Sequence, residues 1–402
     1  MTWTQGRLKW DARLVAGGTP STDDEDLWAD GSDASAVPFV AIGDMSRRTL
    51  VRETAKAVRP KGLASKNMPV GGPGTLLLSM YASVGEVAFL GIRATWNQAI
   101  LGITPDPDRV NPRFLAYALH AVRDQLLSEV RANTQANLNA RQVGDTWYPR
   151  PPLDDQVAIA DYLDHETAKI DTLIANQEAL IVALRERRSA TICNLLGTAK
   201  DRIRLRHAIT LSQTGPFGTQ LSASEYVSGG VPVINPTHIV RGRIDADQDT
   251  SVTAIKAAEL TRFRVSKGDI LLGRKGEVDK SALVEQAHVG WICGSDALLL
   301  RPTLGTEPRF LWWFLQSTAA HAQLERWSVG STVAGLNQRT IAEITLPYDC
   351  RRRQQEMVEE IDAAVFKIEA LAAKTEQFIA LTKERRSALI NAVVTGDVSP
   401  RA

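Results

Sequence analysis

Two long segments of the chain carry apolar residues at steps of three or four positions. They cover about Asp154–Leu196 and Arg353–Val394, and neither contains proline or glycine. A single narrow apolar stripe is typical of a coiled coil, whereas a helix packed in a globular core carries a wider one. The pattern therefore predicts two long helices that cover each other's stripe. The stripe positions are Ile159, Leu163, Ile170, Ile174, Ile181 and Leu184, then Ile361, Val365, Ile368, Leu371, Phe378 and Ile379, with polar Gln177, Thr375 and Thr382 in further positions.

The rest of the chain alternates short apolar runs with turns rich in glycine and proline, which predicts strands. The most apolar run, Gly74–Ile92, is interrupted by Glu86 and by a Val-Gly turn just before it. We therefore expect two short strands joined by a turn rather than a membrane span. A short amphipathic helix is expected before each long helix, over Pro112–Val130 and Pro308–Trp327.

The elements occur twice because the sequence is duplicated. "RERRSA" (Arg185–Ala190) recurs as "KERRSA" (Lys383–Ala388), an offset of 198 residues. Other phrases pair at nearly the same offset. They are "TQANLNARQVGDTWYP" (Thr134–Pro149) with "TVAGLNQRTIAEITLP" (Thr332–Pro347), "NPRFLAYAL" (Asn111–Leu119) with "EPRFLWWFL" (Glu307–Leu315), and "VPFVAIGDM" (Val37–Met45) with "VPVINPTHI" (Val231–Ile239).

The duplication predicts an α+β fold in which two α/β domains are separated by two long helices. Each long helix finds its most similar partner in the other copy, so we expect an antiparallel coiled coil with pseudo-two-fold symmetry. On this interpretation, the length of the helices sets the distance between the two domains.

Composition narrows the class of protein only slightly. The chain has 402 residues, 44% of them hydrophobic and 23% charged, as in ordinary soluble proteins of more than one domain. Its three cysteines form no closely spaced pair, which fits a cytoplasmic protein without disulfides or a zinc site. The net charge of +1 does not by itself indicate nucleic-acid binding.

Motifs for catalysis are not evident. "GDILLGRK" (Gly268–Lys275) departs from a phosphate-binding loop because Arg274 separates the second glycine from the lysine. "INPTH" (Ile234–His238) lacks the second proline and the aromatic ring of an amino-methyltransferase loop. No histidine pattern indicates a metal site, and no glycine motif indicates a cofactor site. We therefore expect a chain without catalytic, metal-binding or cofactor-binding residues.

Basic and amide side chains in the strand-rich regions are candidates for contacts with DNA. Met45–Pro69 carries seven basic residues against the single acid Glu53, so it could contact phosphates or could be a solvated loop. Arginine at a hairpin tip can read guanine, and amides can read adenine. The candidates are Arg47, Arg48, Lys56, Arg59, Lys61, Lys66, Tyr81, Gln135, Asn137, Arg274 and Lys275.

Residues shared by both copies are better candidates for structure or for partner binding. Leu138 and Asn139 recur as Leu336 and Asn337, so a turn or helix cap is expected there rather than a contact that reads sequence. The repeated basic phrase near the end of each long helix favours packing between helices or docking of a partner. The candidates for partner binding are Ile170, Leu173, Arg187, Ile368, Leu371 and Arg385.

In combination, these features resemble the specificity subunit of type I restriction–modification systems. The resemblance covers essentially the whole chain. It rests on the duplication, the paired long helices and several phrases, among them "PPLDDQVAIADYLDHETAKIDTLI" (Pro151–Ile174), "GPFGTQL" (Gly215–Leu221), "TQANLN" (Thr134–Asn139) and "ALINAVVTGDV" (Ala388–Val398). The second copy has "YDCRRRQQEMV" (Tyr348–Val358) in place of "RPPLDDQVAIA", which leaves the start of its helix open.

The resemblance implies target-recognition domains over residues 1–150 and 200–347, and conserved helical regions over 151–199 and 348–402. It implies binding to an asymmetric, bipartite site on double-stranded DNA. It also implies two modification subunits, which bind S-adenosylmethionine and methylate adenine, and possibly two restriction subunits, which use ATP and Mg²⁺. The alternatives are a coiled-coil adaptor with two protein-binding globular ends, and a self-contained methyltransferase or nuclease.

Overall fold

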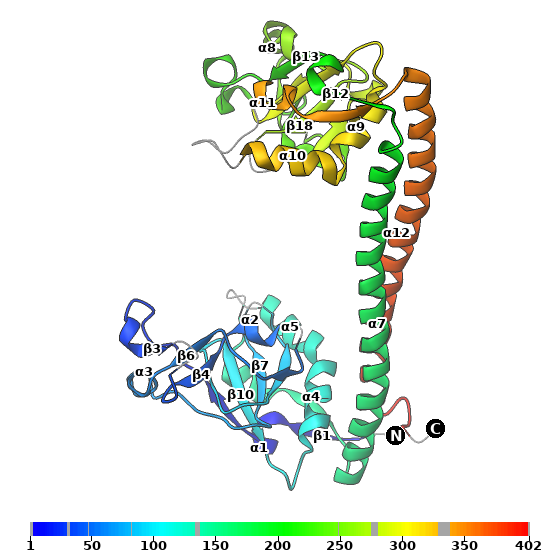
Figure 1. Ribbon diagram of the computed structural model, residues 1–402. Helices are drawn as coiled ribbons and strands as arrows, with labels where there is room; N and C mark the ends of the chain where they lie inside the picture. Colours follow the sequence, from blue (N-terminus) through cyan, green and yellow to red (C-terminus); the bar gives the residue numbers. More distant parts are fainter. Residues whose placement is uncertain are drawn as a thin grey trace. The chain divides into compact units, whose positions relative to one another are not determined.

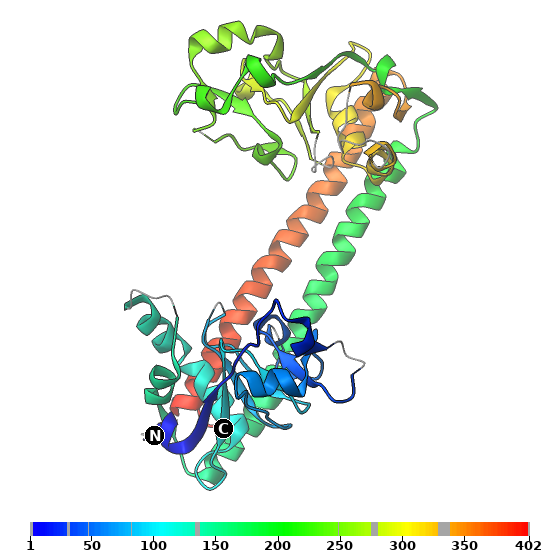
Figure 2. The same ribbon diagram turned by 90° about the vertical axis from the view of Figure 1, so that its left-hand side faces the viewer.

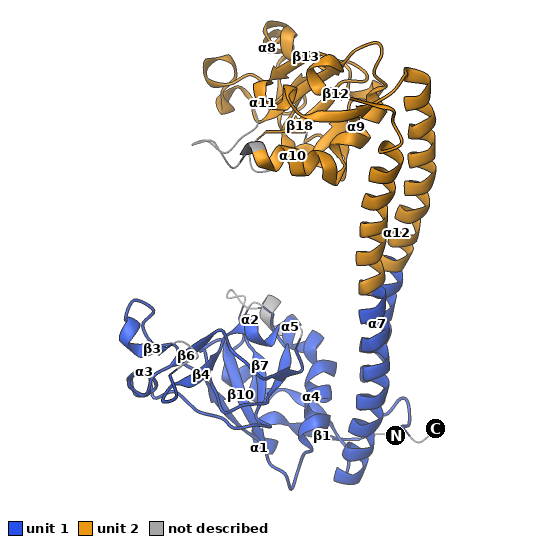
Figure 3. Ribbon diagram, in the orientation of Figure 1, with its two compact units in different colours: residues 1–177, 377–402 blue, residues 178–376 orange. Residues whose placement is uncertain are grey.

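The computed structural model describes residues 3–29, 33–46, 48–81, 83–132, 137–247, 249–274, 280–328 and 338–400 (Figure 1). The chain forms two compact units (Figure 3). Unit 1 contains Met1–Gln177 and Gln377–Ala402, and unit 2 contains Glu178–Glu376. Each unit therefore combines one strand-rich domain with a part of both long helices.

Unit 1 is built on a five-stranded and a four-stranded sheet, with a two-stranded pair beside the long helices. The orders are β2(Ala12–Ala16)-β10(Ile100–Pro105)-β7(Leu76–Ser79)-β8(Val87–Leu90)-β5(Leu50–Val51), β3(Trp28–Ala29)-β6(Lys56–Val58)-β4(Val37–Val40)-β9(Thr95–Trp96) and β1(Thr4–Arg7)-β11(Trp147–Arg150). The short helices are α1(Leu8–Asp11), α2(Ile42–Met45), α3(Pro60–Ser65) and α6(Ala140–Asp145).

Unit 2 repeats this topology. Its four-stranded sheet has the order β13(Ile209–Thr214)-β21(Ala297–Pro302)-β18(Ile270–Gly273)-β19(Ser281–Leu283), which corresponds to β2-β10-β7-β8 of unit 1. The parallel pair β14(Val231–Ile234) and β20(Ile292–Cys293) likewise corresponds to β4 and β9. The remaining elements are β12(Asp201–Arg204) paired with β22(Thr345–Tyr348), β15(Ile239–Val240) with β16(Arg243–Ile244), β17(Ser251–Val252) beside β14, and helices α8(Ala254–Glu259) and α11(Gln338–Ala342).

The strands predicted within Gly74–Ile92 are confirmed as the antiparallel pair β7 and β8. The predicted short helices are each divided in two, so the expectation of one continuous helix was wrong. Unit 1 has α4(Pro112–Ala121) and α5(Arg123–Ala132), and unit 2 has α9(Pro308–Leu315) and α10(Thr318–Ser328). In unit 2, the Ser317 hydroxyl accepts a hydrogen bond from the Ala320 N–H at 3.2 Å, and this cap begins the second helix.

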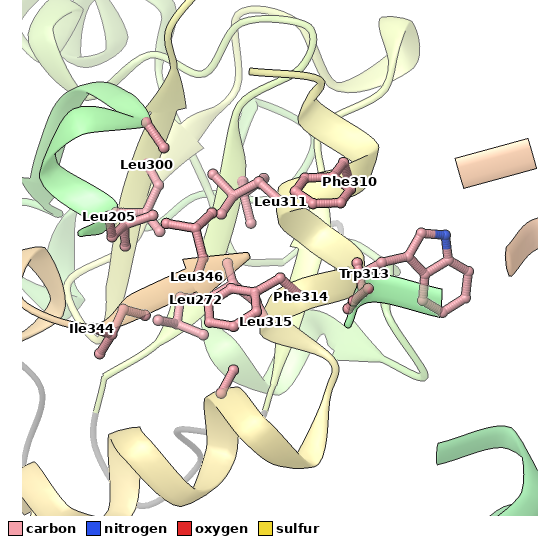
Figure 4. Close-up of a cluster of buried hydrophobic side chains, with 14 of the residues drawn as sticks. Leu205, Leu272, Leu300, Phe310, Leu311, Trp313, Phe314, Leu315, Ile344 and Leu346 are labelled. Carbon is pink, nitrogen blue, oxygen red and sulfur yellow. The ribbon is translucent and has the colours of Figure 1, made fainter. Parts of the chain in front are cut away.

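The two long helices are α7(Leu153–Leu196) and α12(Arg351–Thr395), close to the predicted bounds. In each unit the hydrophobic core includes side chains from both of them. The core of unit 1 takes in Ile159 and Leu163 of α7 together with Ile390 and Val393 of α12. The core of unit 2 takes in the C-terminal part of α7 and the N-terminal part of α12, around a cluster of leucine and phenylalanine side chains (Figure 4).

Within each unit the two helices run antiparallel, side by side (Figures 1 and 2). In unit 2, Arg188 Nε lies 3.0 Å from Glu369 Oε1, while Arg185, earlier in α7, lies 3.7 Å from Glu376, later in α12. In unit 1, Arg386 Nε lies 2.8 Å from Asp171 Oδ1. Since Arg386 follows Arg188 by 198 residues and Asp171 precedes Glu369 by 198, the duplication repeats this ion pair.

Most of the predicted apolar stripe positions are buried, Ile170 and Ile368 are partly buried, and two positions are exposed. Leu371 is 47% exposed and Phe378 is 44% exposed, so their placement in the stripe was wrong. Thr375 and Thr382, which the pattern placed in the stripe as polar positions, are buried as predicted. Each threonine hydroxyl donates to the backbone carbonyl four residues earlier, at 2.9 and 2.7 Å, so the hydroxyl is satisfied without a partner on the facing helix.

Equivalent buried glutamines attach each domain to the start of a long helix. Gln156 Oε1 accepts from the Asn111 N–H at 2.8 Å, and its Nε2 donates to the Pro151 carbonyl at 2.8 Å. In unit 2, Gln354 Oε1 accepts from the Glu307 N–H at 2.8 Å and its Nε2 donates to the Asp349 carbonyl at 2.6 Å. Each glutamine thus joins the backbone N–H of the residue that precedes α4 or α9 to a backbone carbonyl just before α7 or α12.

A second repeated contact holds α4 and α9 against the long helices. Arg113 lies 2.6 Å from Asp164, and Tyr117 donates to the same carboxylate at 2.8 Å. In unit 2, Arg309 lies 2.7 Å from Asp362, to which the Trp313 indole donates at 2.8 Å. Burial is the main cause that raises the pKa of Tyr117 to about 12, so the phenol keeps the proton that it donates.

We expect Asp11→Ala to lower the free energy of unfolding by about 1–3 kcal/mol, because it leaves the buried Tyr148 hydroxyl and the partly exposed Arg150 guanidinium without their acceptor. The Asp11 carboxylate is fully buried and accepts from Tyr148 at 2.8 Å and from Arg150 at 2.6 Å. Glu53→Ala is the control, since the Arg48–Glu53 pair at 3.4 Å is exposed and should contribute at most about 1 kcal/mol. Urea unfolding followed by tryptophan fluorescence measures both variants; equal losses would contradict the expectation.

His120 should make unit 1 less stable in mild acid. Burial is the main cause that lowers its pKa, with Arg386 and Arg123 adding to the effect and Asp124 opposing it. The unfolded chain therefore binds a proton first as the pH falls below about 6.5, and stability is lost from that pH downward.

The matched variant for this test is His120→Gln, because Gln316 occupies the equivalent position of unit 2. We expect a smaller decrease in melting temperature between pH 7.5 and pH 5.5 for the variant than for the unaltered chain. Identical decreases would show that His120 does not titrate differently on folding.

Candidate functional site

Part of the basic segment predicted to contact DNA, Lys56 to Arg59, lies in and beside β6 of the four-stranded sheet of unit 1. Lys56 of β6 is exposed, and its ammonium lies 5.4 Å from the centre of the Trp28 ring on the neighbouring strand. Arg59 lies 3.2 Å from Asp33. Lys56, Trp28 and Arg59 line a shallow pocket of about 480 Å³ together with Glu25. Lys56 and Trp28 thus place a positive charge beside an aromatic ring, a combination suited to a nucleic-acid backbone and bases.

The other predicted DNA contacts are dispersed. Lys61 and Lys66 are exposed on and beside α3, and Asn137 is exposed before α6. Arg48 lies 3.4 Å from Glu53, so part of its charge is neutralised within the chain. Tyr81 and Arg274 are partly buried, just beyond the ends of β7 and β18. Arg47, Gln135 and Lys275 lie outside the described residues.

Asn139 is a helix cap. Its side chain accepts from the Gln142 N–H at 3.0 Å, and the Gln142 side chain accepts from the Asn139 N–H at 3.0 Å. This reciprocal arrangement begins α6, and the preceding Leu138 is buried. In the first copy, the shared Leu-Asn pair therefore has the predicted structural role. The equivalent Leu336 and Asn337 lie outside the described residues.

The exposed faces of the long helices carry apolar side chains at equivalent positions of the two copies. Leu173 is 39% exposed in unit 1, and its equivalent Leu371 is 47% exposed in unit 2. Leu180 and Phe378 are a second such pair, 37% and 44% exposed. Exposed apolar residues that recur by symmetry are typical of docking surfaces for a repeated partner.

The remaining predicted partner-binding residues are two isoleucines and two arginines, which differ in exposure. Ile170 and Ile368 are partly buried, at the edge of the helix pair. Arg187 and Arg385 are exposed. The arginines that join the two helices are the next residues, Arg188 and Arg386, which the sequence interpretation did not single out. The signal was present: each lies four residues after a buried stripe position, Leu184 or Thr382, and so on the same face of its helix.

Unit 1 also contains a groove of about 1040 Å³ between β8, α4 and the long helices. Its apolar wall includes Leu50, Val87, Phe89 and Ala116. Its polar wall includes Arg48, Glu86, Arg113, His120, Arg123 and Arg386. Part of this charge is balanced, because Arg113 and Arg386 contact aspartates of α7.

Among the described residues there is no cluster of three or more acidic, histidine or cysteine side chains placed to hold a metal ion. Cys193, Cys293 and Cys350 are all free thiols, and burial raises the pKa of Cys293 to about 12. No helix in the described part of the chain is long and apolar enough to cross a membrane.

Known proteins share both the sequence pattern and the fold. The chain is 23% identical over 319 residues to the type I restriction enzyme EcoBI specificity subunit of Escherichia coli, a match covering 72% of this chain and 66% of that relative, just under two thirds. It is 24% identical over 176 residues to the StySPI specificity subunit of Salmonella potsdam, covering 42% and 37% of the two chains.

One solved structure that resembles this chain is described as the structural basis of complex assembly and conformational transition of the type I R-M system. The TM-score between its chain and this chain is 0.70. It is 14% identical and is matched over 98% of its length by 99% of this chain, which shows the fold alone. The family model described as "Type I restriction modification DNA specificity domain" matches residues 3–181 and 206–377, most of both copies. The chain therefore belongs to the family of type I restriction modification DNA specificity domains.

Proposed function

We propose that this chain is the DNA-recognition subunit of a type I restriction–modification complex. It reads a bipartite site on double-stranded DNA and positions adenine methyltransferase subunits there. The observation that carries the proposal is the double match to the DNA specificity domain, one match for each copy. The repeated fold gives each unit its own recognition domain and its own part of the helix pair.

The chain supplies recognition and assembly, and its partners supply the chemistry. The absence of catalytic motifs in the sequence supports this division. S-adenosylmethionine would bind to the modification subunits, and ATP and Mg²⁺ to restriction subunits if the complex has them. The equivalent exposed residues Leu173 and Leu371 support two copies of one modification subunit, because a repeated docking surface recruits a repeated partner. The complex would act on DNA in the cytoplasm.

Sequencing of methylated bases, in cells with and without the gene, tests the proposal. A split adenine-methylated motif should be present only when the chain is produced. An unchanged methylome in cells that also produce the modification subunit would contradict the proposed function. It would favour the alternative, a coiled-coil adaptor whose globular ends bind proteins.

Removing the exposed lysines of the first recognition domain should weaken DNA binding with little dependence on sequence. We expect Lys56→Ala, Lys61→Ala and Lys66→Ala, combined in one variant, to reduce the salt dependence of the assembled complex. The slope of log K against log salt should fall by about one for each phosphate that the variant no longer neutralises. Fluorescence anisotropy at several salt concentrations measures it. Lys267→Ala, an exposed lysine of unit 2, is the control, and an equal effect there would argue against a specific basic surface.

A charged side chain at Leu173 or at Leu371 should prevent one modification subunit from binding. We expect Leu173→Glu or Leu371→Glu alone to leave a one-to-one complex with the modification subunit, because burying a carboxylate at an apolar interface is costly. The double variant should bind none. Native mass spectrometry counts the subunits, and circular dichroism confirms that the helices persist. A double variant that still binds two copies would place the docking surface elsewhere.

A further inference from the structure

Equivalent loops follow the first strand of the main sheet in each unit. In unit 1 the Gly17 N–H donates to the Ile100 carbonyl at 3.1 Å, and in unit 2 the Gly215 N–H donates to the Ala297 carbonyl at 3.2 Å. The strand registers agree with this correspondence, because β2 pairs with β10 as β13 pairs with β21. Gly17 and Gly215 are therefore equivalent, at the end of β2 and at the end of β13.

Both glycines hold the loop close to the turn that precedes β10 or β21. A Cβ added at either position would overlap a backbone carbonyl oxygen just before that turn. The same backbone contact therefore sets the course of the loop in the two units. The exposed side chains differ, however, because the second residue after the glycine is Thr19 in unit 1 and Phe217 in unit 2.

In unit 1 the loop positions a glutamine. Gln98 is exposed in the turn between β9 and β10, where the Ile100 N–H donates to the Asn97 carbonyl at 3.0 Å. The Thr19 hydroxyl donates to the side-chain oxygen of Gln98. This bond orients the amide and leaves its two N–H donors and its second oxygen lone pair for another partner. Those are the groups with which glutamine reads adenine, donating to N7 and accepting from the N6 amino group.

In unit 2 the equivalent loop presents an aromatic ring. Phe217 is 63% exposed, although Pro216 before it and Leu221 after it are buried. Gly218 has a φ of 63°, a conformation that glycine adopts without strain. The loop is thus anchored on both sides of an exposed ring. Among the base edges of DNA, the thymine methyl group is the one that phenylalanine contacts.

A basic residue borders each loop. Lys66 is exposed after α3 and lies beside the loop of unit 1, since a Cβ added at Gly18 would be 3.5 Å from the Lys66 Cβ. In unit 2, the Arg274 N–H donates to the Asp296 carbonyl, in the turn before β21, at 2.9 Å. Lysine contacts phosphates and arginine reads guanine, so both loops have neighbours suited to DNA.

The way in which the copies differ favours DNA over a repeated protein partner. A surface that docks two copies of one partner is expected to stay alike in the two units. Two surfaces that read different half-sites must instead present different side chains to the bases. In these loops the backbone hydrogen bonds repeat, whereas the exposed side chains change from polar to aromatic.

We infer that these loops and turns read bases. Gln98, positioned by Thr19, contacts an adenine in the half-site bound by unit 1. Phe217 contacts a thymine methyl group in the half-site bound by unit 2. The inference rests on the proposed function and assigns one specificity-determining residue to each recognition domain.

The first test uses Gln98→Ala and Phe217→Ala, each in the full chain, produced with the modification subunit. Sequencing of methylated bases should show that each variant accepts another base pair at one position of the motif. The two relaxed positions should lie in different half-sites. For Gln98→Ala, discrimination at that position should fall by about tenfold to a hundredfold, the effect of losing one bidentate contact.

The positioning role of Thr19 has its own variants. Thr19→Val removes the hydroxyl and should relax the same position as Gln98→Ala, to a smaller extent. Thr19→Ser keeps a hydroxyl and should retain the motif. Gln5→Ala is the matched control, because Gln5 is an exposed glutamine of β1. It should leave the motif unchanged.

Base analogues identify the contacted atoms in the assembled complex. In the first half-site, 7-deazaadenine lacks the N7 acceptor, so it should weaken binding by the unaltered chain but not by Gln98→Ala. In the second half-site, deoxyuridine lacks the thymine methyl group. It should weaken binding by about fourfold for the unaltered chain and not for Phe217→Ala. Fluorescence anisotropy measures both effects.

Cross-linking tests the same positions without the alanine variants. Benzoylphenylalanine placed at position 98 or 217 of the assembled complex should cross-link to DNA that contains the motif. Cross-links to the modification subunit in place of DNA would overturn the inference. So would an unchanged motif in both alanine variants, two relaxed positions in one half-site, or analogue effects that persist in the variants. An unaltered chain that directs no split motif would instead contradict the proposed function.

Discussion

The fold depends on covering one apolar stripe along each long helix. A helix of this length with a single stripe is not stable alone, because most helical stability in proteins comes from packing of the apolar face. The two stripes cover each other because α7 and α12 pack antiparallel. Arg188 with Glu369 and Arg386 with Asp171 form ion pairs between the two helices. Each strand-rich domain then joins its core to both helices at once.

The duplication preserves polar side chains that make specific hydrogen bonds to the rest of their unit. Gln156 and Gln354 satisfy equivalent backbone groups, and Asp164 and Asp362 accept from equivalent partners. Removing Gln156 or Gln354, which are buried, would leave backbone groups unpaired, a cost that an altered apolar contact avoids by repacking. Apolar positions could therefore diverge, as Ala116 of α4 and the equivalent Trp312 of α9 have done.

The sequence predicted the long helices, the hairpins and the duplication because each of these leaves a periodic signal. It misplaced Leu371 and Phe378 because several apolar residues near those positions compete for the stripe, and Thr375 and Thr382 satisfy their hydroxyls locally. The sequence also overestimated how many basic side chains of Met45–Pro69 are without an acidic partner. Charge can be counted from a sequence, but the pairing of Arg59 with Asp33 depends on distant segments meeting in space.

The core of unit 1 contains side chains from both ends of the chain. Leu8 packs in the same cluster as Ile390, Val393 and Val394. During synthesis, the strand-rich domain of unit 1 is therefore exposed long before the residues that complete its core emerge from the ribosome, whereas unit 2 is a continuous segment, Glu178–Glu376. The domain made first is completed last. A stop codon before Ile390 would therefore damage unit 1, although most of that unit would already have been synthesised.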